Sequence, residues 1–111
     1  MPTRFIFLVL PEVHLLDLAG PDQTIHEAID FGADFELTYC GLHGTLSTSA
    51  GLGIAEQRHF SQVNVRPDDY LVVPGARVKY LTSSAFKANK ELFQWLRDAH
   101  TNGAHLVSIC A

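Results

Sequence analysis

Cys110 is the residue of this sequence with the most evident chemical potential. It ends the apolar segment HLVSIC (105–110), one residue before the last position. A cysteine thiolate attacks electrophilic carbon when a neighbouring group moves the proton. Asp17, in the apolar stretch LLDLAGP (15–21), is the candidate partner, because a carboxyl group among apolar residues is either paired or perturbed. Simpler roles stay open: free cysteine often fills a core, and Asp17 could cap the turn that follows it.

Apolar segments predict the strands that would position these residues. The continuous run RFIFLVL (4–10) is typical of a strand covered on both faces of a parallel sheet. The segments FELTYCGL (35–42), DYLVVPG (69–75) and AHLVSIC (104–110) are interpreted as further strands, the last of them buried. Cys40, in the middle of the second segment, is expected to be a core residue.

Two segments predict helices between the strands. NKELFQWLRDAHTNG (89–103) carries apolar residues at helical spacing, and Asn89 can cap it. Gly20–Pro21 predicts the start of another helix, because proline is favoured at a first helical position, and Gly32 is expected to end it. Less regular segments are interpreted as a hairpin, a polar loop, and a loop or short helix, at 45–57, 58–68 and 76–88.

Strands that alternate with helices predict one α/β domain with a three-layer, doubly wound and mostly parallel sheet. In such sheets, ligands bind beyond the carboxyl ends of the central strands. Asp17, the backbone at Gly75, and Cys110 all follow the ends of apolar strands. We therefore expect them to gather at one edge of the sheet, and this expectation depends on topology alone.

Composition narrows the function. Eight basic and twelve acidic residues give a net charge of −4, which argues against nucleic-acid binding by this segment. No apolar stretch reaches the ~18 residues of a membrane span. Pro11, Glu12 and His14 interrupt the apolar start, which is interpreted as a buried strand of a cytoplasmic protein and not as a signal sequence. The two cysteines have no CxxC spacing, and none of the six histidines is paired with an acidic residue or a cysteine at ligand spacing, so no metal and no cofactor is expected.

Four segments together resemble the ThiJ/PfpI superfamily, whose members have the flavodoxin-like, class-I glutamine-amidotransferase-like fold. The segments are FLVLPEVHLLDLAGP (7–21), TSAGLGI (48–54), DYLVVPG (69–75) and GAHLVSICA (103–111). Two groups in this superfamily share the LLDLAGP-type element: isocyanide hydratases, and AraC-type transcriptional regulators with a ThiJ/PfpI-like N-terminal sensor domain. The C-terminal stretch 91–111 is more similar to the regulators.

This resemblance implies a nucleophile elbow, a sharp strand-to-helix turn that exposes the sulfur of Cys110. It also implies that Asp17 approaches the thiolate and that the glycine-rich loop after the third apolar strand supplies N–H groups. The ligand-binding residues that it implies are Asp17, Gly20, Gly75, Ala76 and Cys110, with Cys110 and Asp17 catalytic only in an enzyme. The family's Pro-Gly-Gly is Pro-Gly-Ala at 74–76 here, which narrows the backbone approach to a ligand.

The resemblance further implies that residues 1–111 are the N-terminal portion of one such domain, without its remainder and without any helix-turn-helix domain. The first hypothesis is a ligand-sensing or dimerisation domain of an AraC-type regulator, with a small-molecule effector, a homodimer, and DNA bound only through an absent C-terminal domain. The alternative is an isocyanide hydratase-like enzyme, in which Cys110 attacks an electrophilic carbon and Asp17 moves the proton. A thiol sensor or aldehyde-handling protein is disfavoured, because that branch usually carries Glu at the position of Asp17.

Overall fold

The computed structural model describes residues 2–55 and 57–110. Ala111, which belongs to the last of the four resembling segments, lies outside the described residues. The strands are β1 (Thr3–Val9), β2 (Phe35–Gly41), β3 (Thr45–Ser47), β4 (Gly53–Ala55), β5 (Arg58–His59), β6 (Tyr70–Pro74) and β7 (His105–Ile109). The helices are α1 (Leu15–Asp30), α2 (Val78–Leu81), α3 (Ser84–Lys87) and α4 (Lys90–Thr101), and a 3-10 turn covers Phe60–Gln62.

Five strands form one sheet in the order β5-β2-β1-β6-β7, and all neighbouring pairs in it are parallel. The central strand β1 is buried from Ile6 to its end at Val9, which explains why the run 4–10 is apolar without alternation. β3 and β4 form a separate antiparallel hairpin, as predicted for 45–57. The predicted α/β class with a parallel sheet is confirmed.

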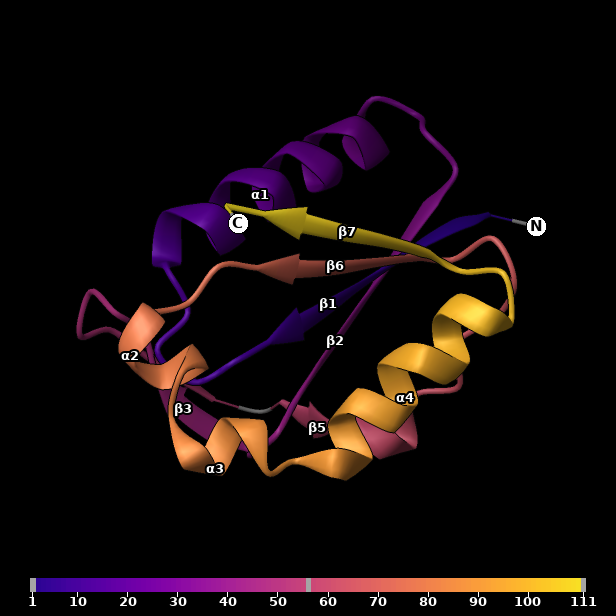
Figure 1. Cartoon of the computed structure of the whole chain (residues 1–111). Helices are drawn as coiled ribbons and strands as arrows, with labels where there is room; N and C mark the ends of the chain where they lie inside the picture. The colour runs from indigo at the N-terminus through magenta and orange to yellow at the C-terminus, as the bar shows by residue number, and fades with distance from the viewer. Residues whose placement is uncertain (1, 56, 111) are drawn as a thin grey trace.

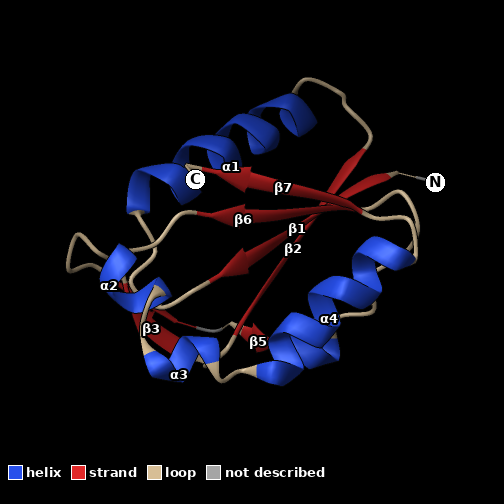
Figure 2. Cartoon of the chain, viewed as in Figure 1, coloured by secondary structure: helices blue, strands red, loops and turns tan. Residues whose placement is uncertain are grey.

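The helices cover both faces of the sheet. Figure 1 shows α1 over one face and α2, α3 and α4 over the other, and Figure 2 shows the same layers by element type. Each face has its own core. Phe7, Val9 and Val72 pack with partly buried residues of α1 on one side, and Ile6, Leu8 and Leu71 pack with Leu92 of α4 on the other.

Helix α1 begins earlier than predicted. It starts at Leu15, so the expectation of a loop up to Gly20–Pro21 is wrong and Pro21 lies inside the helix. Leu18 and Ile25 of this helix pack against the sheet, and such tertiary packing outweighs the cost of an internal proline. The correction matters for the site, because it places Asp17 in the first helical turn. The end of the helix is as predicted, with Gly32 in the left-handed region at φ 104°.

Three further predicted segments can be compared with the structure: one prediction is confirmed, and two need more detail. Helix α4 confirms the prediction for 89–103, and the Asn89 side chain accepts a hydrogen bond from the Leu92 N–H at 3.1 Å. The range 76–88 contains the two short helices α2 and α3. The range 58–68 is not loop throughout, because it contains β5 and a turn that buries Phe60. Within the described residues, no helix is long and apolar enough to cross a membrane.

Among the described residues, strand β7 lies at the edge of the sheet, where only β6 pairs with it. Its residues from His105 to Ser108 are exposed, with Leu106 at 45% and Val107 at 36%. The prediction of a buried strand at 104–110 is therefore wrong. An apolar sequence shows what a strand can bury, whereas its position in the sheet decides what covers it.

Candidate functional site

The structure brings Asp17, Gly75 and Cys110 together at the carboxyl edge of the sheet. A Cβ atom added to Gly75 would stand 3.1 Å from three atoms: Oδ2 of Asp17, Cβ of Cys110 and the carbonyl oxygen of Ile109. The carboxylate of Asp17 and the Cβ of Cys110 therefore both border the space that Gly75 leaves open. We call these three residues the rim.

Cys110 has an uncommon backbone conformation. Its φ is +64°, in the left-handed region, and its side chain is exposed. This region is uncommon for residues other than glycine, and such strain concentrates at functional sites. Within the described residues, Cys110 is exposed and does not fill a core.

Helix α1 delivers Asp17 to the rim. Asp17 lies in its first turn, where the helix dipole favours a negative charge. The alternative role as a cap of a turn at 20–21 is wrong, since those residues are helical. Gly20 lies inside the same helix, and a Cβ there would meet no atom within 4 Å. A Cβ would therefore be crowded at Gly75 and not at Gly20.

In the loop after β6, residues 75–77, two of the three backbone N–H groups already donate hydrogen bonds to backbone carbonyls. The Gly75 N–H donates to the Ile109 carbonyl at 2.8 Å, and the Arg77 N–H donates to the Glu12 carbonyl at 3.0 Å. The Ala76 N–H is the one amide of these three that donates to no carbonyl of the described residues. Ala76 itself is only 4% exposed and forms a bridge with Val13. At most one of these three amides is therefore left for a ligand, fewer than in the glycine-rich loop that the resemblance implies.

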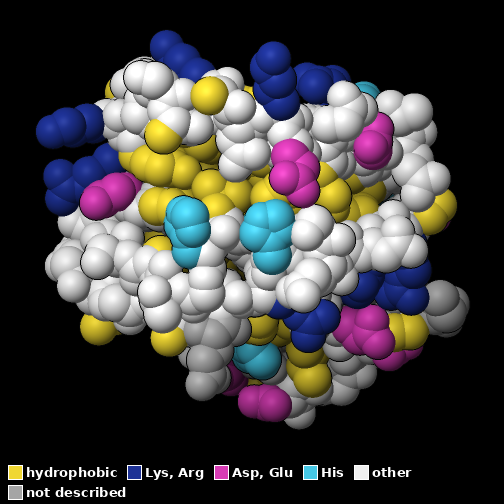
Figure 3. Space-filling model, turned by 90° about the horizontal axis from the view of Figure 1, so that it is seen from below, with side chains coloured by type: hydrophobic (Ala, Val, Ile, Leu, Met, Phe, Trp, Pro, Cys, Tyr) yellow, Lys and Arg dark blue, Asp and Glu magenta, His cyan; other side chains and the backbone are white. Residues whose placement is uncertain are grey.

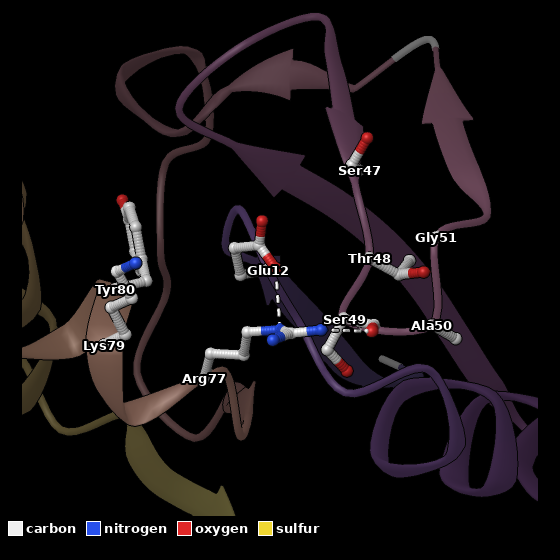
Figure 4. Close-up of a pocket in the computed structure, with 9 residues that line it drawn as sticks. All are labelled: Glu12, Ser47, Thr48, Ser49, Ala50, Gly51, Arg77, Lys79 and Tyr80. Carbon is white, nitrogen blue, oxygen red and sulfur yellow. Dashed lines mark hydrogen bonds and ion pairs between the residues drawn. The ribbon is translucent and has the colours of Figure 1, made fainter.

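A cavity of about 780 Å³ lies beside the rim. Figure 4 shows Glu12 and Arg77 at its centre, with residues 47–51 on one side and Lys79 and Tyr80 on the other. Glu12 Oε2 accepts from Arg77 Nε at 3.1 Å, and Arg77 Nη2 donates to the Ser49 carbonyl at 2.8 Å. Sequence reasoning missed these residues. The available signal was their position, since Glu12 and Arg77 closely follow the ends of two predicted strands.

Cys40 is the opposite of Cys110. It is fully buried in β2 and belongs to the core cluster on the α4 side of the sheet, as predicted. Burial raises the pKa of its thiol to about 12, and Arg58 lowers it by a smaller amount. A thiol in this environment stays protonated and is a poor nucleophile.

The interpretation of the histidines needs one correction. His26 Nε2 lies 3.8 Å from Asp22 Oδ1, one helical turn earlier, and 3.0 Å from the Tyr39 hydroxyl. The Tyr39 hydroxyl donates to Asp22 Oδ1 at 2.5 Å. Burial raises the pKa of Tyr39, and the hydrogen bond and charge of Asp22 raise it further. An Asp–His pair at helical spacing therefore exists, although the described residues contain no group of three side chains that could hold a metal ion.

The strand order places the chain among doubly wound α/β proteins, a class in which ligands usually bind at the carboxyl edge of the sheet. No protein-family model and no curated protein matches the chain. Solved structures do match, and they narrow this class. An AraC family transcriptional regulator from Pseudomonas putida has a TM-score of 0.75 and 21% identity over 96% of this chain. Drosophila melanogaster DJ-1beta has a TM-score of 0.77 and 20% identity over 100% of it. A ThiJ/PfpI family protein from Pseudomonas syringae has a TM-score of 0.73 and 20% identity over 97%.

The chain therefore has the fold of DJ-1 and ThiJ/PfpI proteins, and the resemblance found in the sequence is confirmed at the level of the fold. The match covers 55%, 56% and 42% of those three structures, in the same order. The chain thus spans about half of their length.

Proposed function

We propose that this chain forms part of the ligand-sensing domain of an AraC-type transcriptional regulator, with the rim as the place where a small-molecule effector binds. The observation that carries the proposal is the approach of Asp17 and Cys110 across Gly75, at the edge where this fold binds ligands. The AraC family regulator among the structural neighbours supports it. The loop after β6 supports it too, because two of its amides are engaged with backbone carbonyls and do not offer an oxyanion site.

In the complete regulator, DNA binding would belong to a further domain, and the protein would act as a cytoplasmic homodimer. An effector changes DNA affinity only when it binds one arrangement of the protein better than another. The rim suits this role because its residues come from separate elements, α1, the loop after β6 and the end of β7. A ligand that contacts all three would stabilise one relative placement of them.

The complete reading frame tests this proposal. We expect about 200 further residues with helix-turn-helix patterns. Asp17→Asn in the complete protein should leave its basal DNA affinity unchanged and should alter the response of that affinity to fractions of cell metabolites, measured by gel shift. A reading frame that ends with this domain would contradict the regulator.

The second candidate is an isocyanide hydratase-like enzyme, and the left-handed, exposed Cys110 favours it. Its thiolate would attack the isocyanide carbon while Asp17 supplies a proton to that carbon. Water would then add to the resulting thioimidate and the C–S bond would break, which releases the formamide and the free thiol. Turnover of an aryl isocyanide to the formamide by the complete protein, lost in Cys110→Ser, would support the enzyme. A complete protein that shows no turnover but binds DNA would rule in favour of the regulator.

A further inference from the structure

The cavity beside the rim has the position and size of a binding site of its own. We call it the Arg77 groove and define it by its lining residues, Glu12, Ser47, Thr48, Ser49, Ala50, Gly51, Arg77, Lys79 and Tyr80. Its volume of about 780 Å³ is within the range of small-molecule sites. Neither Asp17 nor Cys110 lines it, so it is separate from the rim.

The groove lies at the point where the connections of the sheet diverge. The chain leaves β1 towards α1, on one face, and leaves β6 towards α2, α3 and α4, on the other (Figure 1). Crevices at such switch points are the usual ligand sites of open α/β sheets. Glu12 follows β1, Arg77 follows β6, and the turn between β3 and β4 closes the third side (Figure 4).

The charges of the groove favour an anion. Seen from below, Lys and Arg side chains gather at the end of the molecule where α2 lies, beside an acidic side chain (Figure 3). A guanidinium has five N–H groups. Arg77 uses one of them to bind Glu12 and one to bind the Ser49 carbonyl. Lys79 makes no ion pair with any described residue. The lining of the groove thus contains two cations, Arg77 and Lys79, and one carboxylate, Glu12.

Tyr80 adds a neutral donor to the same wall. Burial raises the pKa of its hydroxyl, so the phenol stays protonated at neutral pH and can donate a hydrogen bond. Glu12 shows that the guanidinium of Arg77 accommodates a carboxylate in this position. The backbone of Glu12 is held on both sides, because its N–H donates to the Ser47 carbonyl at 2.9 Å and its carbonyl accepts from the Arg77 N–H. Only its side chain needs to move to admit a second anion.

We propose that the Arg77 groove binds a small organic oxyanion, a carboxylate or a phosphate, with Arg77 as the principal contact and with Lys79 and Tyr80 completing the site. The planar fork of arginine matches both anions. Glu12 acts as an internal competitor that occupies Arg77 when no ligand is bound. The proposal does not depend on the regulator function, although an effector with an anionic group could use this site.

The test is a titration of the isotope-labelled chain with succinate and, separately, with inorganic phosphate, at constant ionic strength, followed by amide chemical shifts. We expect saturable shifts confined to residues 48–51 and 77–80. Arg77→Gln should weaken the binding at least about tenfold, as expected for loss of a charged hydrogen-bonding partner. Arg77→Lys, which keeps the charge but loses the fork, should fall in between. Glu12→Gln should strengthen the binding, because it removes the competing carboxylate.

Two controls separate specific binding from general effects. Lys87→Gln removes a charge of the same sign from α3, outside the groove, and should leave the affinity unchanged. Asp17→Asn should also leave the affinity unchanged. This control distinguishes anion binding in the Arg77 groove from binding at the rim. The proposal is overturned if the shifts do not saturate, if they spread over the surface, if Lys87→Gln weakens binding as much as Arg77→Gln, or if Glu12→Gln weakens it. Whichever of succinate and phosphate saturates identifies the class of anion.

Discussion

The two cysteines differ in the properties that control thiol reactivity. Cys110 is exposed, whereas Cys40 is fully buried and has a pKa raised to about 12. We expect one thiol of the folded chain to react promptly with a disulfide reagent and the other to react only after unfolding. Cys110→Ser should remove the prompt reaction, and Cys40→Ser should remove the reaction that follows denaturation. The absorbance of the released thiolate measures both.

The same titration, repeated over pH, addresses the catalytic role of Cys110. An activated nucleophile has a pKa below the ~8.5 of free cysteine, whereas a merely exposed thiol titrates near that value. If Asp17 activates Cys110 in an enzyme, Asp17→Asn should shift the pH profile of the prompt reaction. A profile like that of free cysteine, unchanged by Asp17→Asn, would argue against the hydratase alternative.

At the scale of elements, Pro21 is the least expected feature of α1. A proline inside a helix lacks the N–H that would bond the carbonyl four residues earlier, which here belongs to Asp17. Pro21→Ala should supply that bond and raise the free energy of unfolding by about 1 to 3 kcal/mol. Gln23→Ala, at an exposed position of the same helix, should change it by only a few tenths. Urea denaturation measures both variants, and a loss of stability in Pro21→Ala would show that the helix is adapted to its proline.

The buried thiol of Cys40 in strand β2 makes the free energy of unfolding depend on pH. The pKa of Cys40 is raised from 9.0 to about 12 in the folded chain, so the unfolded chain loses this proton first as the pH rises. The free energy of unfolding should therefore fall above pH ~9, by at most about 1.4 kcal/mol per pH unit from this group. The raised pKa values of Tyr39 and Tyr80 act in the same direction. Cys40→Ala should make the slope shallower in urea denaturation, and an unchanged slope would contradict this cause.

Sequence patterns predicted the elements that depend on local signals. The run 4–10, the stripe of α4 with its Asn89 cap, and the hairpin at 45–57 were all found where expected. The start of α1 was predicted wrongly, because packing against the sheet overrides the local preference of proline. The exposure of β7 was predicted wrongly as well, because the sequence of one strand does not show which other elements of the fold cover it.

The candidate sites also include one part that the sequence predicted, the rim, and one part that it did not, the Arg77 groove. Topology alone predicted that Asp17, Gly75 and Cys110 would meet, because the carboxyl ends of parallel strands share one edge. The Arg77 groove could not be predicted, because the pairing of Glu12 with Arg77 depends on the bridge between Val13 and Ala76 and on the position of the hairpin turn. Loop-to-loop contacts of this kind leave no periodic signal in a sequence.

At the scale of the whole molecule, the exposed side of β7 is the feature that decides behaviour in solution. An edge strand offers unpaired backbone groups to any other strand. Here that edge also carries Leu106 and Val107, which point to opposite faces and are 45% and 36% exposed. Phe31 and Leu16, both on the α1 side of the chain, are exposed too. Apolar surface of this kind usually marks a contact with another protein.

We therefore expect the chain by itself to self-associate through β7, with sedimentation equilibrium showing a mass above the 12.3 kDa of one copy. Val107→Lys places a charge on this edge and should shift the equilibrium towards the monomer, because lysine protects edge strands from pairing. Val78→Lys is the matched control, since it replaces an exposed valine on α2, away from the edge, and should leave the mass unchanged. A chain that stays monomeric at high concentration would contradict the prediction. Equal loss of association in both variants would contradict a contact through β7, because the added charge would then act in the same way wherever it is placed.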